Sequence, residues 1–390
     1  MSFLGKATYG AGVDLPELAE DVSDIVGIVS PHETPLLDHL GDAKRAATSP
    51  LHEWIEDTLV PNFDTINQTT FTPSAQDATS ITVNNGARFV PGDLVRPGNA
   101  GEVIMVTLVL GNVLTVVRRY GSTPASNLSN GLRLTVLGNA AIEGSDAPVA
   151  RFTSRVRRQN YTQIFMSTVD VTGTMQAARS LGVQDEYDYQ KQERLRELMR
   201  DLENCVINGT APASTPLGSS TVRRSMNGIM RLVTTNQFVP GQGGFPSGGG
   251  SGTDLNEALL NAALRNVWEQ SSGTVDTIVC GGLQKRRINQ FISTSARAYS
   301  PEDRKLSDVV GVYESDFGVC RVVLSRWVPA DAVILLDSSR VSVMPMAGRS
   351  FHFRPLATTG DSLTGMVVGE YTLEFKNENA HGVVRGLSVT

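Results

Sequence analysis

Residues 28–59 open with Ile28-Val-Ser-Pro-His-Glu-Thr-Pro-Leu-Leu-Asp-His-Leu-Gly41 and close with His52-Glu-Trp-Ile-Glu-Asp-Thr-Leu59. Pro31 and Pro35 each lack a backbone N–H and crowd the preceding residue, so no helix should run through both. Trp54 then lies in an alternating, carboxylate-bearing strand. Enzyme domains rarely begin in this way. The segment predicts an extended N-terminal arm, residues 1–53, with anchor points that reach outside the chain's own core.

Length and composition set wide bounds. The 390 residues suffice for two or three domains, and 40% hydrophobic with 19% charged residues is ordinary for a folded protein. A formal net charge of −6 argues against a protein whose main function is to bind nucleic-acid phosphates. It allows a surface that faces nucleic acid without binding it tightly. Cys205, Cys280 and Cys320 fit neither a zinc spacing nor a disulfide framework. With no signal pattern and no membrane-length apolar run, we expect a soluble chain made in the cytoplasm.

Residues 69–140 have a different character, because short apolar β-type runs alternate with turn signals there. Gly111-Asn112 lies between two such runs and predicts a hairpin, since glycine supplies the positive φ of a two-residue turn. Roughly five or six short strands separated by turns indicate a small β-barrel or sandwich. The stretch reads as an insertion, because its flanks, 54–68 and 141–171, resemble two limbs of one long hairpin.

The strongest helix signal covers residues 183–207, where one apolar stripe faces a charged side and Asn208-Gly209 ends the pattern. Residues 223–330 read as α/β, with Asp254 and Glu257 as a capping box that begins a helix. Residues 331–390 read mainly as strands.

Catalytic and metal motifs are missing from the sequence. The five histidines include no His-Glu-x-x-His, and His32 and His39 read as solvated arm residues. There is no Gly-x-Ser-x-Gly elbow. The glycine-rich run 241–252 lacks the Gly-Lys-Ser/Thr ending of a phosphate-binding loop and reads as a flexible loop. We therefore expect no catalytic, cofactor-binding or metal-binding residues.

The densest basic cluster is Arg151-Phe-Thr-Ser-Arg155-Val-Arg157-Arg158. It can be a solvated strand edge charged against aggregation, an inter-subunit salt-bridge surface, or, less favoured, a nucleic-acid contact. Lys285-Arg286-Arg287 is expected on the solvent-exposed face of a helix. Lysine occurs only six times, with none between Lys44 and Lys191.

Four groups of motifs follow one another along the chain and together span nearly its whole length. They are Ser30-Pro31-His-Glu-Thr34-Pro35 with His52-Glu53-Trp54-x-x-Asp57-x-Leu59; Gly281-Gly282-Leu-Gln284-Lys285-Arg286-x-Ile288-Asn289; Tyr313-Glu-Ser-Asp316-Phe317-Gly318 with Ser325-Arg326-Trp-Val-Pro329; and Leu356-Ala-x-Thr-Gly360-Asp361-Ser362 with Glu370-Tyr371-Thr-Leu-Glu374, Asn377 and Ala380-His381-Gly382. In this order they resemble the tailed-bacteriophage major capsid protein with the Hong Kong 97 shell fold, in the branch with a β-domain inserted in the extended loop. The resemblance implies an α+β fold. Its expected parts are the N-terminal arm 1–53, extended-loop limbs 54–68 and 141–171, an inserted β-domain 69–140, a peripheral domain 172–222 with a spine helix 183–207, an axial domain 223–330, and returning strands 331–390.

The resemblance further implies a non-enzymatic subunit that assembles with itself into hexamers and pentamers of an icosahedral head around double-stranded DNA. Such a protein resides in the virion, and in the host cytoplasm during assembly. Scaffolding, portal and decoration proteins are the expected partners. Only about fifty residues precede the hairpin, so a cleaved scaffolding segment is not expected. Without a lysine in the extended loop, a lysine–asparagine crosslink is not expected either.

Two other functions stay open: an encapsulin-like nanocompartment shell, and, more distantly, an α/β hydrolase-type enzyme. Inter-subunit contacts are expected at Pro31, Pro35, Trp54, Arg151, Arg155, Arg157, Arg158, Glu193, Arg196 and Arg200.

Overall fold

The computed structural model describes residues 33–41, 43–57, 59–144, 153, 155–177, 185–242, 245–250, 252–271, 273–295, 311–357 and 360–389. Pro31, Arg151 and His32 lie outside the described residues. The fold is α+β and forms two compact units, one of Ile55–Val156 and one of Met1–Trp54 with Arg157–Thr390.

The unit Ile55–Val156 is a small closed barrel. Its six-stranded sheet has the order β2-β7-β4-β5-β6-β3, and its outer strands meet through a bridge between Ile66 and Val83 and a hydrogen bond from Asn67 N to Thr82 O of 2.9 Å. Gly111, with φ of 59°, and Asn112 form the two-residue turn between β5 and β6. Apolar side chains from all six strands or the residues next to them fill the barrel. The elements are β2 (Phe63–Thr65), β3 (Ser80–Thr82), η2 (Gly86–Arg88), β4 (Asp93–Pro97), β5 (Ile104–Leu110), β6 (Val113–Val117), η3 (Tyr120–Ser122) and β7 (Arg133–Asn139).

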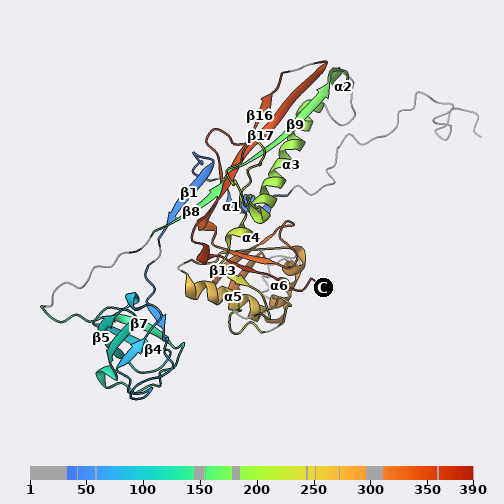
Figure 1. The fold of residues 1–390 in the computed structure, drawn as a ribbon. Coiled ribbons are helices and arrows are strands. Elements are labelled where there is room, and N and C mark those ends of the chain that lie inside the picture. Colours follow the sequence, from blue (N-terminus) through green and yellow to red (C-terminus); the bar gives the residue numbers. More distant parts are fainter. Residues whose placement is uncertain are drawn as a thin grey trace, which may run out of the picture. The chain divides into compact units, whose positions relative to one another are not determined.

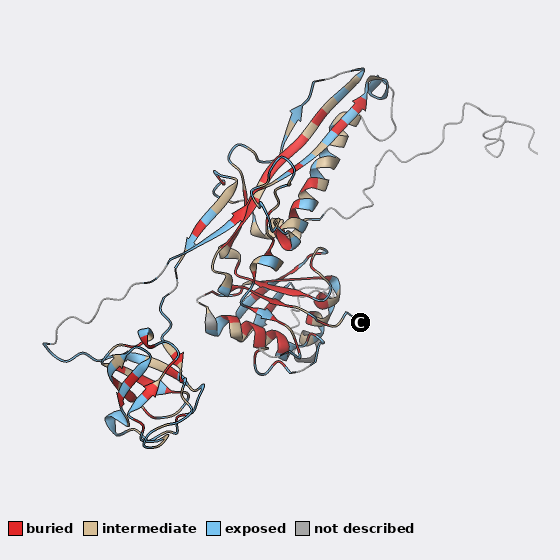
Figure 2. Cartoon of the chain, viewed as in Figure 1, coloured by how far each residue is buried: buried red, intermediate tan, exposed pale blue. Residues whose placement is uncertain are grey.

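The second unit contains a six-stranded mixed sheet of order β10-β18-β14-β11-β13-β12. Its central strand β11 is fully buried, parallel to β13 and antiparallel to β14. Figure 2 shows that buried residues are concentrated in this sheet and in α5. The elements are β10 (Gln237–Phe238), α5 (Glu257–Gln270), β11 (Thr277–Cys280), α6 (Gly282–Ser295), β12 (Val312–Ser315), β13 (Gly318–Leu324), β14 (Val333–Leu336) and β18 (Gly382–Val384).

The capping box expected at Asp254 is wrong. The N-cap of α5 is Asn256, whose side chain accepts the Leu259 N–H at 2.8 Å. Asp254 instead pairs with Arg287 at 3.2 Å.

The same unit has a second, four-stranded sheet built on the long strand β17. β17 pairs with β9 over ten residues, from Ser362 opposite Thr172 to Tyr371 opposite Gln163. The helix α3 runs beside β9 and β17 (Figure 1). A Cβ on Gly365 of β17 would lie 2.1 Å from Phe353, so only glycine lets this ring pack there. The elements are β9 (Gln163–Thr172), α2 (Gly173–Ala177), α3 (Glu186–Asn208), α4 (Ile229–Leu232), η4 (Ser338–Arg340), β15 (Val341–Pro345), β16 (His352–Pro355), β17 (Ser362–Phe375) and η5 (Glu378–Ala380).

The long helix begins three residues later than the expected 183–207. Asp185 is its N-cap and accepts the N–H groups of Tyr187 and Asp188. Leu198, Leu202 and Val206 are buried and join the core shared with β9 and β17. The apolar stripe therefore holds the helix on the sheet, while its charged side stays at the surface.

The expectation of an arm outside the core is wrong for the described residues before position 50. Pro35 occupies the first turn of α1 (Pro35–Leu40), where its missing N–H costs nothing. Leu36 is 0% exposed in the core of its own unit, and Ala47 is buried in a bridge to Met346. This stretch packs on its own chain.

Candidate functional site

A two-stranded ribbon, β1 (Leu51–Glu56) paired with β8 (Val156–Tyr161), carries most of the described basic cluster. Arg157 Nη1 lies 3.6 Å from Glu53 Oε2, and Arg155 Nε lies 3.9 Å from Asp57 Oδ2. The two arginine side chains are 75% (Arg155) and 70% (Arg157) exposed, and Arg158 is exposed as well. Exposed pairs at such distances hold little energy, so the guanidinium groups remain accessible to a carboxylate of another molecule.

Trp54 belongs to the core, which corrects the expectation that it contacts a neighbour. Its side chain is 7% exposed and packs in the cluster that contains α3 and β17. His52 Nε2 on the same strand lies 2.7 Å from Glu374 Oε2. Burial alone would raise the pKa of Glu374, but hydrogen bonds from Lys376 and His52 hold it below its usual value. This strand is therefore fastened to β17 inside one subunit.

The charged side of α3 holds the candidates Glu193, Arg196 and Arg200, and each pairs with a charged residue of the same helix. Arg196 Nη1 lies 2.5 Å from Glu193 Oε1, three residues apart. Arg200 Nε lies 3.4 Å from Asp201 Oδ1. Pro35, at the start of α1, is half-buried.

A buried carboxylate, missed by the sequence reasoning, connects several segments of the same unit. Glu370 is 3% exposed and pairs with Arg224 at 2.6 Å and Arg349 at 2.7 Å. Thr162 Oγ1 donates to it at 2.6 Å. A glutamate in a strand of otherwise apolar pattern was the available signal, because a buried charge requires partners.

Of two side chains expected in solvent, Lys285 is buried and His39 is half-buried. Lys285 is 8% exposed, and its Nζ donates to Val322 O at 3.4 Å, so the basic run of α6 is not simply a wet face. His39 Nε2 lies 2.7 Å from Thr277 Oγ1 of β11, and burial lowers the pKa of His39. A helix seen alone does not show which side its tertiary neighbours will cover.

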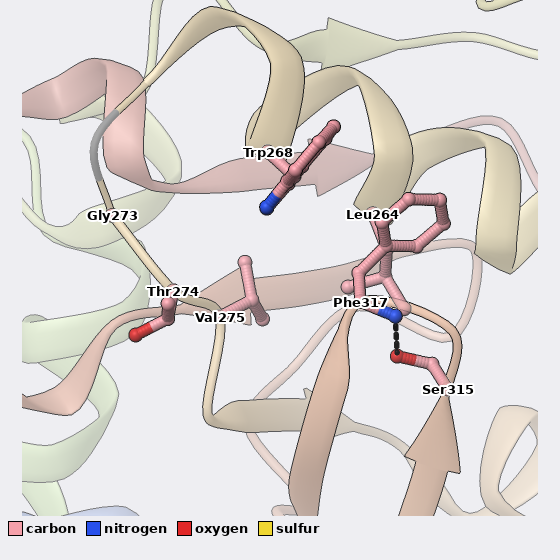
Figure 3. Close-up of a pocket in the computed structure, with 7 residues that line it drawn as sticks. All are labelled: Leu264, Trp268, Gly273, Thr274, Val275, Ser315 and Phe317. Carbon is pink, nitrogen blue, oxygen red and sulfur yellow. Dashed lines mark hydrogen bonds between the residues drawn. The ribbon is translucent and has the colours of Figure 1, made fainter.

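A small hollow in the second unit lies between the end of α5 and the β12–β13 turn (Figure 3). It is lined by seven residues without a titratable side chain: Leu264, Trp268, Gly273, Thr274, Val275, Ser315 and Phe317. Its ≈ 10 Å³ of space holds about one water molecule. This hollow offers neither room nor groups for catalysis.

Within the described part of the chain, no cluster of three or more metal-ligating side chains occurs. Among the helices that the structure describes, none has the length and apolarity to cross a bilayer.

The model of the SU10 major capsid protein family matches residues 5–388. The chain belongs to the SU10 major capsid protein family. It is 36% identical to a major capsid protein of Pseudomonas phage PaMx41 over 105 residues, which are 27% of this chain and 25% of that protein. It is 23% identical to a major capsid protein of Escherichia phage Phieco32 over 291 residues, which are 63% of this chain and 80% of that protein. The first match thus spans about a quarter of the relative's length.

Solved structures agree with this capsid protein in fold. One is the capsid of a native GTA particle, with a TM-score of 0.53, 8% identity, and coverage of 98% of this chain and 99% of that chain. Another, from Gordonia phage Cozz, has a TM-score of 0.52 and 11% identity over 100% of this chain and 98% of that chain. Family membership gives this major capsid protein a structural role as a virion component.

Proposed function

We propose that this capsid protein adopts the Hong Kong 97-type fold and assembles with itself into hexamers and pentamers of an icosahedral head that encloses double-stranded DNA. The observation that carries the proposal is the family match over residues 5–388. The likeness in fold to capsid structures over nearly the full chain adds support.

The parts of the chain have matching roles in this proposal. Residues 54–68 and 141–171 form the extended loop and 69–140 its inserted β-domain, which agrees with the separate core of the barrel. Residues 172–222 form the peripheral domain around α3, 223–330 the axial domain, and 331–390 return to both. In the described part of the arm, Leu36 and Ala47 pack on their own unit.

The surface chemistry is suited to many weak contacts between copies. Exposed arginines on the β1–β8 ribbon and charge pairs on α3 can exchange partners with a neighbour at small cost. Heterologous contacts of this type close into rings, and many of them acting together stabilise a shell. With no lysine between Lys44 and Lys191, the ribbon and barrel supply no lysine for a lysine–asparagine crosslink.

Assembly in the host cytoplasm with a separate scaffolding protein, a portal and decoration proteins completes the proposal. The net charge of −6 agrees with a lumen that faces DNA without specific binding.

Negative-stain microscopy of the purified full chain over a range of protein concentrations tests the proposal. We expect shells or ring-shaped capsomers, with a matching rise in mass by light scattering. A stable monomer at every concentration would contradict self-assembly. Uniform, correctly sized shells from the chain alone would remove the need for a scaffolding protein while supporting the rest.

A further inference from the structure

A buried carboxylate on α3 holds the start of α1. Glu203 is 0% exposed, and its Oε2 accepts the backbone N–H groups of Leu36 at 3.2 Å and Leu37 at 3.3 Å. Its Oε1 accepts the hydroxyl of Ser325 at 3.0 Å. One side chain thus joins three segments that are far apart in the sequence.

The docking of α1 depends on this carboxylate because the residues around the start of α1 supply no side-chain cap of their own. Thr34, the N-cap of α1, makes no side-chain capping bond, so Glu203 accepts N–H groups that the helix itself leaves unpaired. A six-residue helix has no stability of its own in water. Leu36 inserts into the core beside Glu203 and is 0% exposed.

The described partners of the Glu203 carboxyl are all neutral donors. On α1, Asp38 adds negative charge, and His39 bonds to Thr277 instead. Arg326, next to Ser325, is 62% exposed and pairs with Glu33 at 3.5 Å, and Arg231 of α4 is exposed. Burial raises the pKa of Glu203 to about 7, against the opposing hydrogen bonds from Leu37, Ser325 and Leu36.

We propose that Glu203 is a proton-controlled latch, which docks residues 33–41 on α3 when protonated and loosens them when ionised. Protonated, the carboxyl still accepts both N–H groups and can donate its proton to Ser325 Oγ, so it places no charge in the core. Ionised, it is a buried charge without a cation, and opening the segment to water relieves that cost. The latch concerns the isolated subunit and does not depend on the proposed shell.

The direction of the pH effect follows from the two protonation states. The carboxyl binds its proton more tightly when docked, with a pKa of about 7, than when open, with the ordinary 4.5. Docking is therefore fully stabilised below pH 4.5, and this stabilisation is lost as the pH rises through 7. Between pH 5.5 and 8.5 we expect about a 30-fold increase in the open fraction of residues 33–41.

Hydrogen exchange of the full chain under non-assembling conditions tests the latch. After correction for the intrinsic rate, the peptide covering residues 33–41 should lose about 30-fold protection between pH 5.5 and 8.5 in the wild type. Glu203→Gln, which is neutral at both pH values, should show no such loss. Asp201→Asn, on an exposed carboxylate of the same helix, is the matched control and should behave as the wild type. Peptides of the barrel serve as the internal reference.

An unchanged protection in the wild type across this range overturns the latch, as does an equal loss in Glu203→Gln. If Glu203→Gln does not fold, the pH dependence of protection in the wild type still tests the latch. The loss must be confined to residues 33–41 and the residues they contact, with a midpoint near pH 7, and a loss shared with the barrel peptides also overturns the proposal.

Discussion

Glu102 and Arg118 form an ion pair inside the barrel, where each depends on the other. Glu102 is 0% exposed, and its carboxylate takes two hydrogen bonds of 2.8 Å from Arg118 and two more from Ser126. Glu102→Gln leaves a buried guanidinium without its anion, so we expect the barrel to lose about 3–5 kcal/mol of stability. Hydrogen-exchange protection of β5 and β6 in the full chain measures this loss.

The exposed pair of Asp77 and Arg119 provides the control at the same scale. Both side chains are about half exposed, so Asp77→Asn should cost about 0–1 kcal/mol. Burial alone would raise the pKa of Glu102, but the bonds from Arg118 and Ser126 lower it from 4.5 to about 2. The stability that ionised Glu102 contributes is present above pH 4.5 and is lost as the pH falls toward 2. The wild type should show this loss and Glu102→Gln should not. Equal losses of stability in Glu102→Gln and Asp77→Asn would contradict the prediction.

Buried polar residues were the least predictable from sequence. Glu102 and Glu203 occur in an ordinary local context and Glu370 in a mainly apolar strand, and only the folded chain brings their partners to them. Trp54 was recognised as an anchor, but the strand pattern does not show whether its ring enters its own core or a neighbour's. The arginines of the ribbon were predictable as exposed because their cluster has no apolar periodicity.

At the scale of elements, the apolar stripe of α3 gives a direct test. Leu202 is 2% exposed in the core against the sheet, whereas Leu195 on the same helix is 38% exposed. Leu202→Ala should therefore cost about 2–5 kcal/mol through lost contacts and a cavity. Leu195→Ala should cost clearly less, because Leu195 is partly exposed and lies outside the core cluster, and alanine is a good helix former. Urea unfolding followed by far-UV circular dichroism compares the two. Similar midpoints would contradict this packing role.

Elements with a strong apolar pattern were predictable, and those that depend on tertiary contacts were not. Residues 331–390 contain the strands β14 to β18, as expected, and the Gly111-Asn112 turn lies between two strands as expected. The helix α1 was missed, because Glu203 supplies the cap that its own sequence lacks. The cap of α5 was misplaced by two residues, since Asp254 and Asn256 are equally good cap residues locally.

At the scale of the whole molecule, the order of motifs predicted a capsid protein because that order reflects the fold over the full chain, as the family match confirms. The pairing of β1 with β8 joins residues about a hundred positions apart, and the composition of neither strand determines it. The described part of residues 28–59 also contributes to the subunit's own core. Removing residues 28–59 would take Leu36 and Trp54 out of the core. Such a deletion should therefore destabilise the subunit itself as well as its contacts.

A charge exchange on the β1–β8 ribbon separates contacts within a subunit from contacts between subunits. Arg157→Glu should leave the subunit folded, because its pair with Glu53 is exposed and about 0–1 kcal/mol is at stake. If Arg157 binds a carboxylate of a neighbouring copy, this variant should form few or no shells by negative-stain microscopy while keeping its circular dichroism. The double variant Glu53→Arg/Arg157→Glu restores the pair within the ribbon but keeps the reversed charge at position 157, so assembly should stay impaired. Arg231→Glu, at an exposed arginine on α4, is the control for charge reversal alone. Recovery of shells in the double variant would assign Arg157 a role inside its own subunit and refute the contact between copies.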